Sequence, residues 1–197
     1  MDNKKLIAGF GYQEGRISSW DGKRTYTQAV PQMAKHCCDN GVDEILVYDW
    51  SVTDEDHEAA IAVIKEVCRE ADAPVIAGGR VKRMEDVKKY LYAGASAVFL
   101  DMSKEENKDM IKEASDRFGK EKIYAYLPTD EYIDSVKDYE AAGASVMLLN
   151  TAGSVPSLLE MASISDSEAS FLFFLQAKDD AKDTAESLKN AFGCGNI

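Results

Sequence analysis

Residues 74–100, PVIAGGRVKRMEDVKKYLYAGASAVFL, contain one complete strand–helix–strand unit. The unit begins with an apolar run that ends in two glycines, and it closes with the apolar run SAVFL. Between them lies a charged segment of helical length that ends at Gly94. Two strands joined through a helix can pair in parallel, because a parallel pair needs a crossover of this kind. The segment therefore predicts a βαβ unit and gives the pattern to look for elsewhere in the chain.

The same alternation of apolar and charged segments extends over the whole chain. Continuously apolar strands separated by amphipathic helices are typical of a parallel sheet that helices cover on the outside. We therefore expect an α/β protein with about seven parallel strands and helices outside them. The predicted strands are residues 6–10, 44–50, 74–79, 96–102, 122–127, 145–150 and 170–176, and further helices are expected at 156–162 and 177–192.

A glycine precedes three of the predicted strands. Gly41, Gly94 and Gly143 each end a helical segment shortly before a strand begins, and a glycine there supplies a left-handed helix cap. The spacing between these glycines is about 50 residues, or two βα units, which suits a TIM-type (βα) barrel with equivalent alternate strands. A doubly wound sheet is the alternative, since it uses similar glycine loops.

The length of 197 residues fits a single domain that covers residues 1–197. Seven predicted strands are one fewer than the eight of a standard TIM-type barrel. The chain stops at GCGNI, where an eighth strand would have to begin. We therefore expect an incomplete or open barrel, or the N-terminal part of a longer protein.

Composition and charge disfavour several classes of partner. Thirty-five acidic and 23 basic side chains give a formal net charge of −12, which disfavours nucleic acid and anionic membranes. The N-terminus lacks the long apolar region of a signal peptide, and no apolar stretch is long enough for a membrane span. We therefore expect a cytoplasmic protein. A local basic pocket for a phosphate is compatible with this acidic total.

Functional side chains of a TIM-type barrel lie at the carboxyl ends of the strands. After the strand at 74–79, Gly78 and Gly79 would let backbone N–H groups approach an anion, and the following helix would add positive potential. Arg80 could then clamp a phosphate. The alternative is that the two glycines only make a tight turn, with Arg80 in solvent.

Acidic and hydroxyl side chains end two other predicted strands. Asp49 could act as a base or hold a substrate hydroxyl, and the same possibilities hold for Asp101 and Ser103. Equally, these residues could cap the helices that follow, with Ser51 as a further candidate for the cap after Asp49. His57 lies in a helical segment, far from any strand end, and we expect a surface or helix-packing histidine there and not a catalyst.

Metal and Schiff-base chemistry have little support in the sequence. No cysteine lies in a C-x-x-C pair or near a histidine at zinc-finger spacing. Only the well-separated Asp49 and Asp101 offer carboxylates that could converge on a metal, and no predicted strand contains an interior lysine for a Schiff base. We therefore expect no metal and no cofactor.

Four stretches together make the chain resemble the (βα) barrels of histidine biosynthesis: LIAGFGYQEGR (6–16), ILVYDW (45–50), VIAGGRVKRMEDVKKYLYAGASAVFL (75–100) and FGKEKIYAYL (118–127). This family includes the phosphoribosylformimino-AICAR-phosphate isomerase and the cyclase subunit of imidazole glycerol phosphate synthase. The resemblance covers residues 4 to about 150 in order. It implies two similar half-barrels and a ligand with a phosphate at each end, the first phosphate at residues 78–80 with help from residues 101–103.

The chain departs from the family pattern at both catalytic positions. The family's aspartate at the end of strand one corresponds to Gly11, and the carboxylate that ends strand five corresponds to Leu127. Asp49 matches an aspartate that ends the family's second strand. Since an acid–base pair supplies a factor of about 10² to 10⁴ per proton transfer, the resemblance implies a degenerate member that does not catalyse the family reaction.

Three functions follow from these observations. The first is a non-catalytic phosphate-ligand-binding or accessory domain, joined to or associated with a histidine-pathway enzyme of the phosphoribosyl-AMP cyclohydrolase or phosphoribosyl-ATP pyrophosphatase type. The second is an active isomerase or lyase on a phosphorylated sugar, with Asp49 as base and Arg80 as anchor. The third is a structural interaction module, in which a partner or a second copy of the chain in a homo-oligomer covers an open barrel edge.

Overall fold

The structure is a computed structural model that describes residues 6–19, 25–26, 29–39, 41–127, 136–144, 146–150 and 169–173. Its strands are β1 (Leu6–Gln13), β2 (Arg16–Ser19), β3 (Thr25–Tyr26), β4 (Glu44–Asp49), β5 (Val75–Gly78), β6 (Ala97–Asp101), β7 (Ile123–Leu127), β8 (Val146–Asn150) and β9 (Ala169–Phe173). Its helices are α1 (Val30–Asp39), α2 (Asp54–Glu70), α3 (Met84–Tyr92), α4 (Glu105–Phe118), the 3₁₀ helix η1 (Lys120–Lys122) and α5 (Val136–Ala141). The helices predicted at 156–162 and 177–192 lie outside the described residues.

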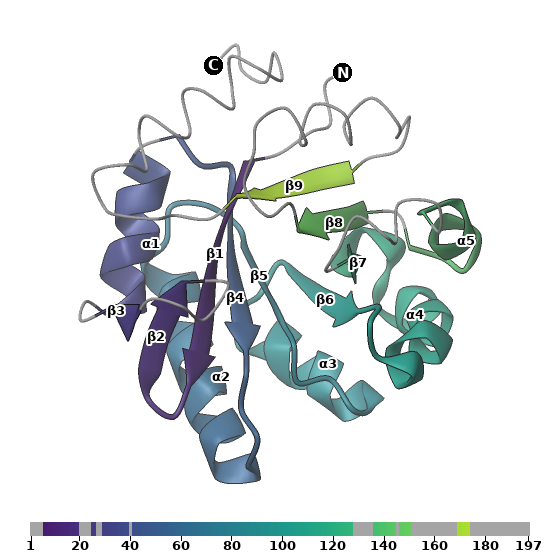
Figure 1. Ribbon diagram of the computed structural model, residues 1–197, viewed down its shortest axis with the longest axis horizontal. Coiled ribbons are helices and arrows are strands. Elements are labelled where there is room, and N and C mark those ends of the chain that lie inside the picture. The colour runs from purple at the N-terminus through teal and green to yellow at the C-terminus, as the bar shows by residue number, and fades with distance from the viewer. Residues whose placement is uncertain are drawn as a thin grey trace.

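Seven strands of the sheet run in parallel, in the order β1-β4-β5-β6-β7-β8-β9. The last of them, β9, also pairs with β1 over Leu6–Ala8, so the order returns to its start. Figure 1 shows the helices on the outer side of these strands. The prediction of a TIM-type α/β fold with about seven parallel strands is therefore confirmed, and each predicted strand is present. Within the described residues the parallel strands number seven, one fewer than the eight of a standard barrel.

Alternate strand residues contribute to two separate cores, as the twofold period of a strand requires. The smaller core fills the lumen with Ile7, Leu46, Tyr48, Ile76, Ala97, Phe99, Tyr124 and Tyr126. The larger core lies between the sheet and the helices and includes Val47, Ile64, Val87, Leu100 and Leu127. This alternation decides where the strand-end acids point. Asp101 comes two residues after Phe99 of the lumen, whereas Asp49 comes two residues after Val47 of the outer core.

The first strand is longer than the sequence indicated. It continues to Gln13 and turns back at Glu14 and Gly15, whose φ angles are 49° and 71°. Two successive positive φ angles are typical of a two-residue hairpin turn. The chain therefore forms an antiparallel ribbon of β1, β2 and β3, which was not predicted. Figure 1 shows this ribbon beside α2.

The helix ends differ in part from the sequence-based expectation. The glycines predicted as left-handed caps, Gly41, Gly94 and Gly143, have φ angles of 83°, 108° and 110°, which confirms them. The predicted N-terminal caps were wrong. Thr53 caps α2 by accepting a hydrogen bond from the backbone of Asp56, and the N-cap position of α4 is Lys104. Asp49, Ser51, Asp101 and Ser103 are therefore not helix caps.

Among the described residues, no helix combines the length and apolar composition needed to cross a lipid bilayer.

Candidate functional site

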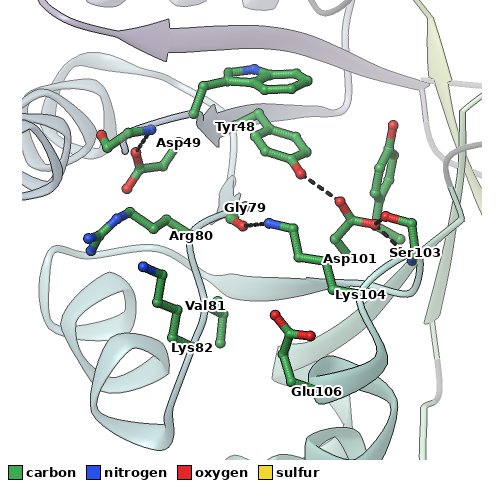
Figure 2. A pocket seen from close by; sticks show the side chains of 13 residues that line it. Tyr48, Asp49, Gly79, Arg80, Val81, Lys82, Asp101, Ser103, Lys104 and Glu106 are labelled. Atoms are coloured by element: carbon green, nitrogen blue, oxygen red, sulfur yellow. Dashed lines mark hydrogen bonds between the residues drawn. The ribbon is translucent and has the colours of Figure 1, made fainter. Parts of the chain in front are cut away.

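A pocket of about 590 Å³ opens at the carboxyl ends of β4, β5, β6 and β7. Five of the six predicted phosphate-site and catalytic residues line it, namely Asp49, Gly79, Arg80, Asp101 and Ser103. Figure 2 shows that these side chains come from neighbouring strand ends and surround one hollow. The other lining residues were not among the predicted phosphate-site and catalytic residues; they are Tyr48, Trp50, Ser51, Val81, Lys82, Lys104, Glu106 and Tyr126.

The two glycines after β5 are required by packing against neighbouring strands. A Cβ atom on Gly78 would lie 2.3 Å from the carbonyl oxygen of Phe99, and one on Gly79 would lie 2.4 Å from the ring of Tyr48. Gly79 also has a φ of 106°, which strongly favours glycine. This supports the tight-turn interpretation of the pair. The turn nevertheless borders the pocket, where the carbonyl of Gly79 accepts a hydrogen bond from Lys104 Nζ at 2.5 Å.

The backbone amides at the start of α3 already have an anionic partner. The Asp86 carboxylate accepts hydrogen bonds from the N–H groups of Lys82 and Arg83, at 2.9 and 3.2 Å. Asp86 is buried and occupies the third helical position, as in a capping box. The predicted approach of an anion to these amides would therefore have to compete with a side chain of the same helix. A ligand in this pocket depends more on cationic side chains than on the helix terminus.

Arg80 is not a solvent-exposed arginine, since only 8% of it is accessible. Its Nη2 donates to Asp54 Oδ1 at 2.6 Å and lies 3.4 Å from the carbonyl oxygen of Val52. The hydrogen bond from Arg80 and the charge of that guanidinium lower the pKa of Asp54. Arg80 is thus a buried cation whose anionic partner among the described residues is a carboxylate at the start of α2.

Asp49 joins three segments around the pocket and does not point into the lumen. Its Oδ2 lies 2.6 Å from His57 Nδ1 and accepts a hydrogen bond from the Tyr90 hydroxyl at 2.8 Å, while Oδ1 accepts from the Ser51 amide at 2.9 Å. Burial raises the pKa of Asp49, but the hydrogen bonds from His57, Ser51 and Tyr90 outweigh it and leave the pKa below its ordinary value. Asp49 therefore holds α2 and α3 against the end of β4.

His57 corrects one sequence-based expectation. It does pack within a helix interface, as predicted, and it is 1% exposed. It was wrong to place it far from any strand end, because its ring meets Asp49 at the end of β4. The residues are eight positions apart on a strand and a helix, so only the tertiary fold brings them together.

Asp101 lies at the mouth of the lumen and accepts hydrogen bonds from two different strand ends. Tyr48 donates its hydroxyl to Asp101 Oδ2 at 2.6 Å, and Ser103 donates both its hydroxyl and its amide to Oδ1 at 2.6 and 3.0 Å. Burial and the neighbouring Asp101 carboxylate raise the pKa of Tyr48, so Tyr48 stays protonated as a donor. Figure 2 shows Lys104 between this cluster and Gly79.

Gly11 and Leu127 are the two positions that the resemblance matches to catalytic carboxylates, and their surroundings differ. A Cβ atom on Gly11 would lie 2.7 Å from both Trp50 Nε1 and Ser18 Oγ, so Trp50 fills the space beside this residue. The Trp50 ring stacks on Tyr48 with a centroid separation of 4.3 Å. Leu127 belongs to the outer core between sheet and helices and is fully buried. Neither position presents a polar side chain at the lumen mouth.

Metal binding has no support in the part of the chain that the structure describes. No group of three or more histidine, cysteine, aspartate or glutamate side chains is arranged there to hold an ion. The charged side chains that line the pocket are Arg80, Lys82 and Lys104, together with the carboxylates of Asp49, Asp101 and Glu106.

The Asp49 contacts predict a large and pH-dependent effect on stability. Asp49→Ala should lower the free energy of unfolding by about 3 to 5 kcal/mol, since a buried charged acceptor with three partners is lost. Because the folded pKa of Asp49 lies below its unfolded value, its contribution is present above about pH 3.9 and is lost as the pH falls through the folded pKa. Urea denaturation over a series of pH values measures both effects.

A matched control for this substitution is Asp39→Asn, which changes an exposed carboxylate 3.8 Å from Lys35. This control should change stability by no more than about 0.5 kcal/mol. Equal stability of the two variants at neutral pH would contradict the role assigned to Asp49.

Comparison with known proteins agrees with this architecture. The family model described as "Histidine biosynthesis protein" matches residues 14–140. The imidazole glycerol phosphate synthase subunit HisF of Staphylococcus aureus strain Newman is 30% identical over 137 residues, which are 68% of this chain and 53% of the relative. The same subunit from strains COL and MRSA252 matches equally well, and the chain spans about half the length of these relatives. Fold and sequence together show that the chain belongs to the histidine biosynthesis protein family.

Proposed function

We propose that this chain is a histidine-biosynthesis barrel domain that binds a phosphorylated small molecule at the pocket beside Arg80 and does not catalyse the family's isomerase or cyclase reaction. The observation that carries the proposal is the contrast between the two parts of the mouth. The rim beside β5 keeps a buried arginine and two lysines, whereas the space beside Gly11 is filled by Trp50.

The cationic rim supports a phosphorylated ligand. Arg80, Lys82 and Lys104 line one pocket in a chain whose net charge is −12. An arginine favours phosphate because its planar guanidinium can make two parallel hydrogen bonds, and lysine adds a point charge. Of the three carboxylates that line the pocket, Asp49 and Asp101 are each engaged by protein donors, and Glu106 is an exposed side chain of α4. Asp49 and Asp101 therefore oppose an incoming anion less than two free carboxylates would.

The loss of catalysis is supported by the resemblance to the family together with the packing at Gly11. The family's first aspartate corresponds to Gly11, where a larger residue would collide with Trp50 and Ser18. The second corresponds to Leu127, which lies in the outer core. Loss of both members of an acid–base pair removes a factor of about 10² to 10⁴ for each proton transfer. The domain would then act as a cytoplasmic accessory to an attached or associated enzyme of the phosphoribosyl-AMP cyclohydrolase or phosphoribosyl-ATP pyrophosphatase type.

Two other functions have weaker support. A sugar-phosphate isomerase that uses Asp49 as its base would need that carboxylate at the ligand, but three protein donors hold it toward α2 and α3. A structural interaction module would need an unpaired barrel edge that a partner or a second copy could cover. In the structure β9 pairs with β1.

Ligand binding should depend on Arg80. We expect ribose 5-phosphate to bind the purified protein in isothermal titration calorimetry and Arg80→Met to weaken binding about 10- to 100-fold, the range for a lost charge-assisted hydrogen bond. Arg80→Lys keeps the positive charge but lacks the planar guanidinium, so its affinity should lie between those of the wild type and Arg80→Met. The matched control is Lys112→Met, which removes an exposed lysine paired with Asp116 on α4. Binding that Arg80→Met leaves unchanged would exclude this site.

The packing at Gly11 gives a separate test of the lost acid. The wild-type protein should not turn over phosphoribosylformimino-AICAR phosphate. Gly11→Asp should lower stability by about 1 to 3 kcal/mol, because its Cβ enters occupied space beside Trp50. Trp50→Gly should relieve part of this cost, so a double-mutant cycle should show favourable coupling of about 1 kcal/mol. Turnover by the wild-type protein, or additive effects of the two substitutions, would contradict the proposal.

A further inference from the structure

The ion pair of Arg80 and Asp54 has an unusual asymmetry. The Arg80 side chain is 8% exposed, whereas the Asp54 side chain is 98% exposed. A cation that has been removed from water needs a counter-charge, because burial without one is costly. An exposed carboxylate gains little from the same pair, since solvent and salt screen it. The ion pair therefore stabilises the charge of Arg80 more than it stabilises the charge of Asp54.

The contact also leaves the guanidinium only partly satisfied. Asp54 Oδ1 accepts from Nη2 at 2.6 Å, and the carbonyl of Val52 lies at a weak 3.4 Å from the same atom. Nε of Arg80 is buried and has no hydrogen-bond partner among the described residues. Nε and an adjacent Nη form the edge that binds a carboxylate or phosphate through two parallel bonds. A ligand with several anionic oxygens could complete this edge, whereas Asp54 uses one point of it.

The position of the Asp54 carboxylate is favourable for an anion in general. The hydrogen bond and charge of Arg80, together with the charges of Lys82 and Arg83, lower the pKa of Asp54. Figure 2 shows the Lys82 side chain extending on the same side of the pocket as Arg80. Asp86 already occupies the backbone amides of Lys82 and Arg83. The surroundings of Asp54 are therefore an anion site made of cationic side chains.

We propose that Asp54 is an internal counterion of Arg80, that the phosphoryl group of the ligand displaces it, and that Asp54 thereby sets which anions the site admits. This inference rests on the proposed phosphate-binding function. A phosphoryl dianion offers more charge and more acceptor oxygens than a carboxylate, so it can replace Asp54 and also reach Nε. The displaced Asp54 carboxylate is already almost fully hydrated and loses little. A monoanion gains too little to compete with a tethered carboxylate.

Calorimetric titration of four proteins tests this inference, with inorganic phosphate and ribose 5-phosphate as probes at fixed ionic strength. Asp54→Asn removes the competing charge and should tighten binding of both probes about two- to fivefold, the range for an exposed ion pair. Glu58→Gln on the same helix removes an equal charge, one that pairs with Lys89, and should leave affinity nearly unchanged. Arg80→Met should weaken binding about 10- to 100-fold. The fourth protein is the wild type.

The outcomes separate the two proposals. Tighter binding by Asp54→Asn than by Glu58→Gln supports displacement. Equal affinities of Asp54→Asn, Glu58→Gln and wild type, with binding weakened in Arg80→Met, overturn the role of Asp54 and leave the phosphate site standing. No binding by any of the proteins, or binding that Arg80→Met leaves unchanged, overturns both.

A second measurement reports displacement directly. The carboxyl ¹³C resonance of Asp54 should shift as phosphate is added at about pH 8, where phosphate is mostly a dianion, because Arg80 is withdrawn from that carboxylate. The carboxyl resonance of Glu58, which pairs with Lys89, should stay in place. An Asp54 resonance that does not move in protein saturated with phosphate would overturn displacement.

Discussion

The buried carboxylate of Asp49 is the contact on which the geometry of the barrel mouth depends. It receives hydrogen bonds from the loop after β4 and from Tyr90 of α3, and it contacts His57 of α2. A charged acceptor in a poorly solvated place makes strong hydrogen bonds and is costly to leave unpaired. The helices it holds carry Asp54 and Asp86, so the two acids that compete for cations and amides at the pocket are positioned through Asp49.

The mouth has two regions of different chemical character. Over the lumen, the rings of Tyr48, Trp50, Phe99 and Tyr126 contact one another and leave no acidic side chain at Gly11. Along the rim between β5 and β6, cationic side chains line the pocket. The four packed rings supply apolar surface, and Gly11 beside them carries no group for proton transfer. The cationic side chains at the rim can recognise an anion. The two parts of the mouth therefore offer different surfaces, positive charge on one side and aromatic rings on the other.

Sequence alone was sufficient for the elements whose signals are local. The seven parallel strands are continuous apolar runs, and the three glycine caps follow helical segments, so both could be predicted. Other features depend on strand alternation, which is hard to read from an apolar run. Asp49 and Asp101 follow similar strands, yet one contacts His57 and the other Tyr48. The β2–β3 ribbon was not predicted. Lys104 and Asp54 were not among the predicted site residues, because only tertiary packing brings both to the β5 turn.

The central claim is that the turn after β5 binds a phosphoryl group through Arg80. The most direct test is to follow the arginine ¹⁵Nε–H resonances by NMR during titration with ribose 5-phosphate. The Nε–H signal of Arg80, which has no hydrogen-bond partner among the described residues, should shift and saturate, while that of Arg117 near Phe118 should stay in place. A fixed Arg80 signal at saturating ligand, or equal shifts at Arg80 and Arg117, would show that the phosphoryl group does not bind at this turn.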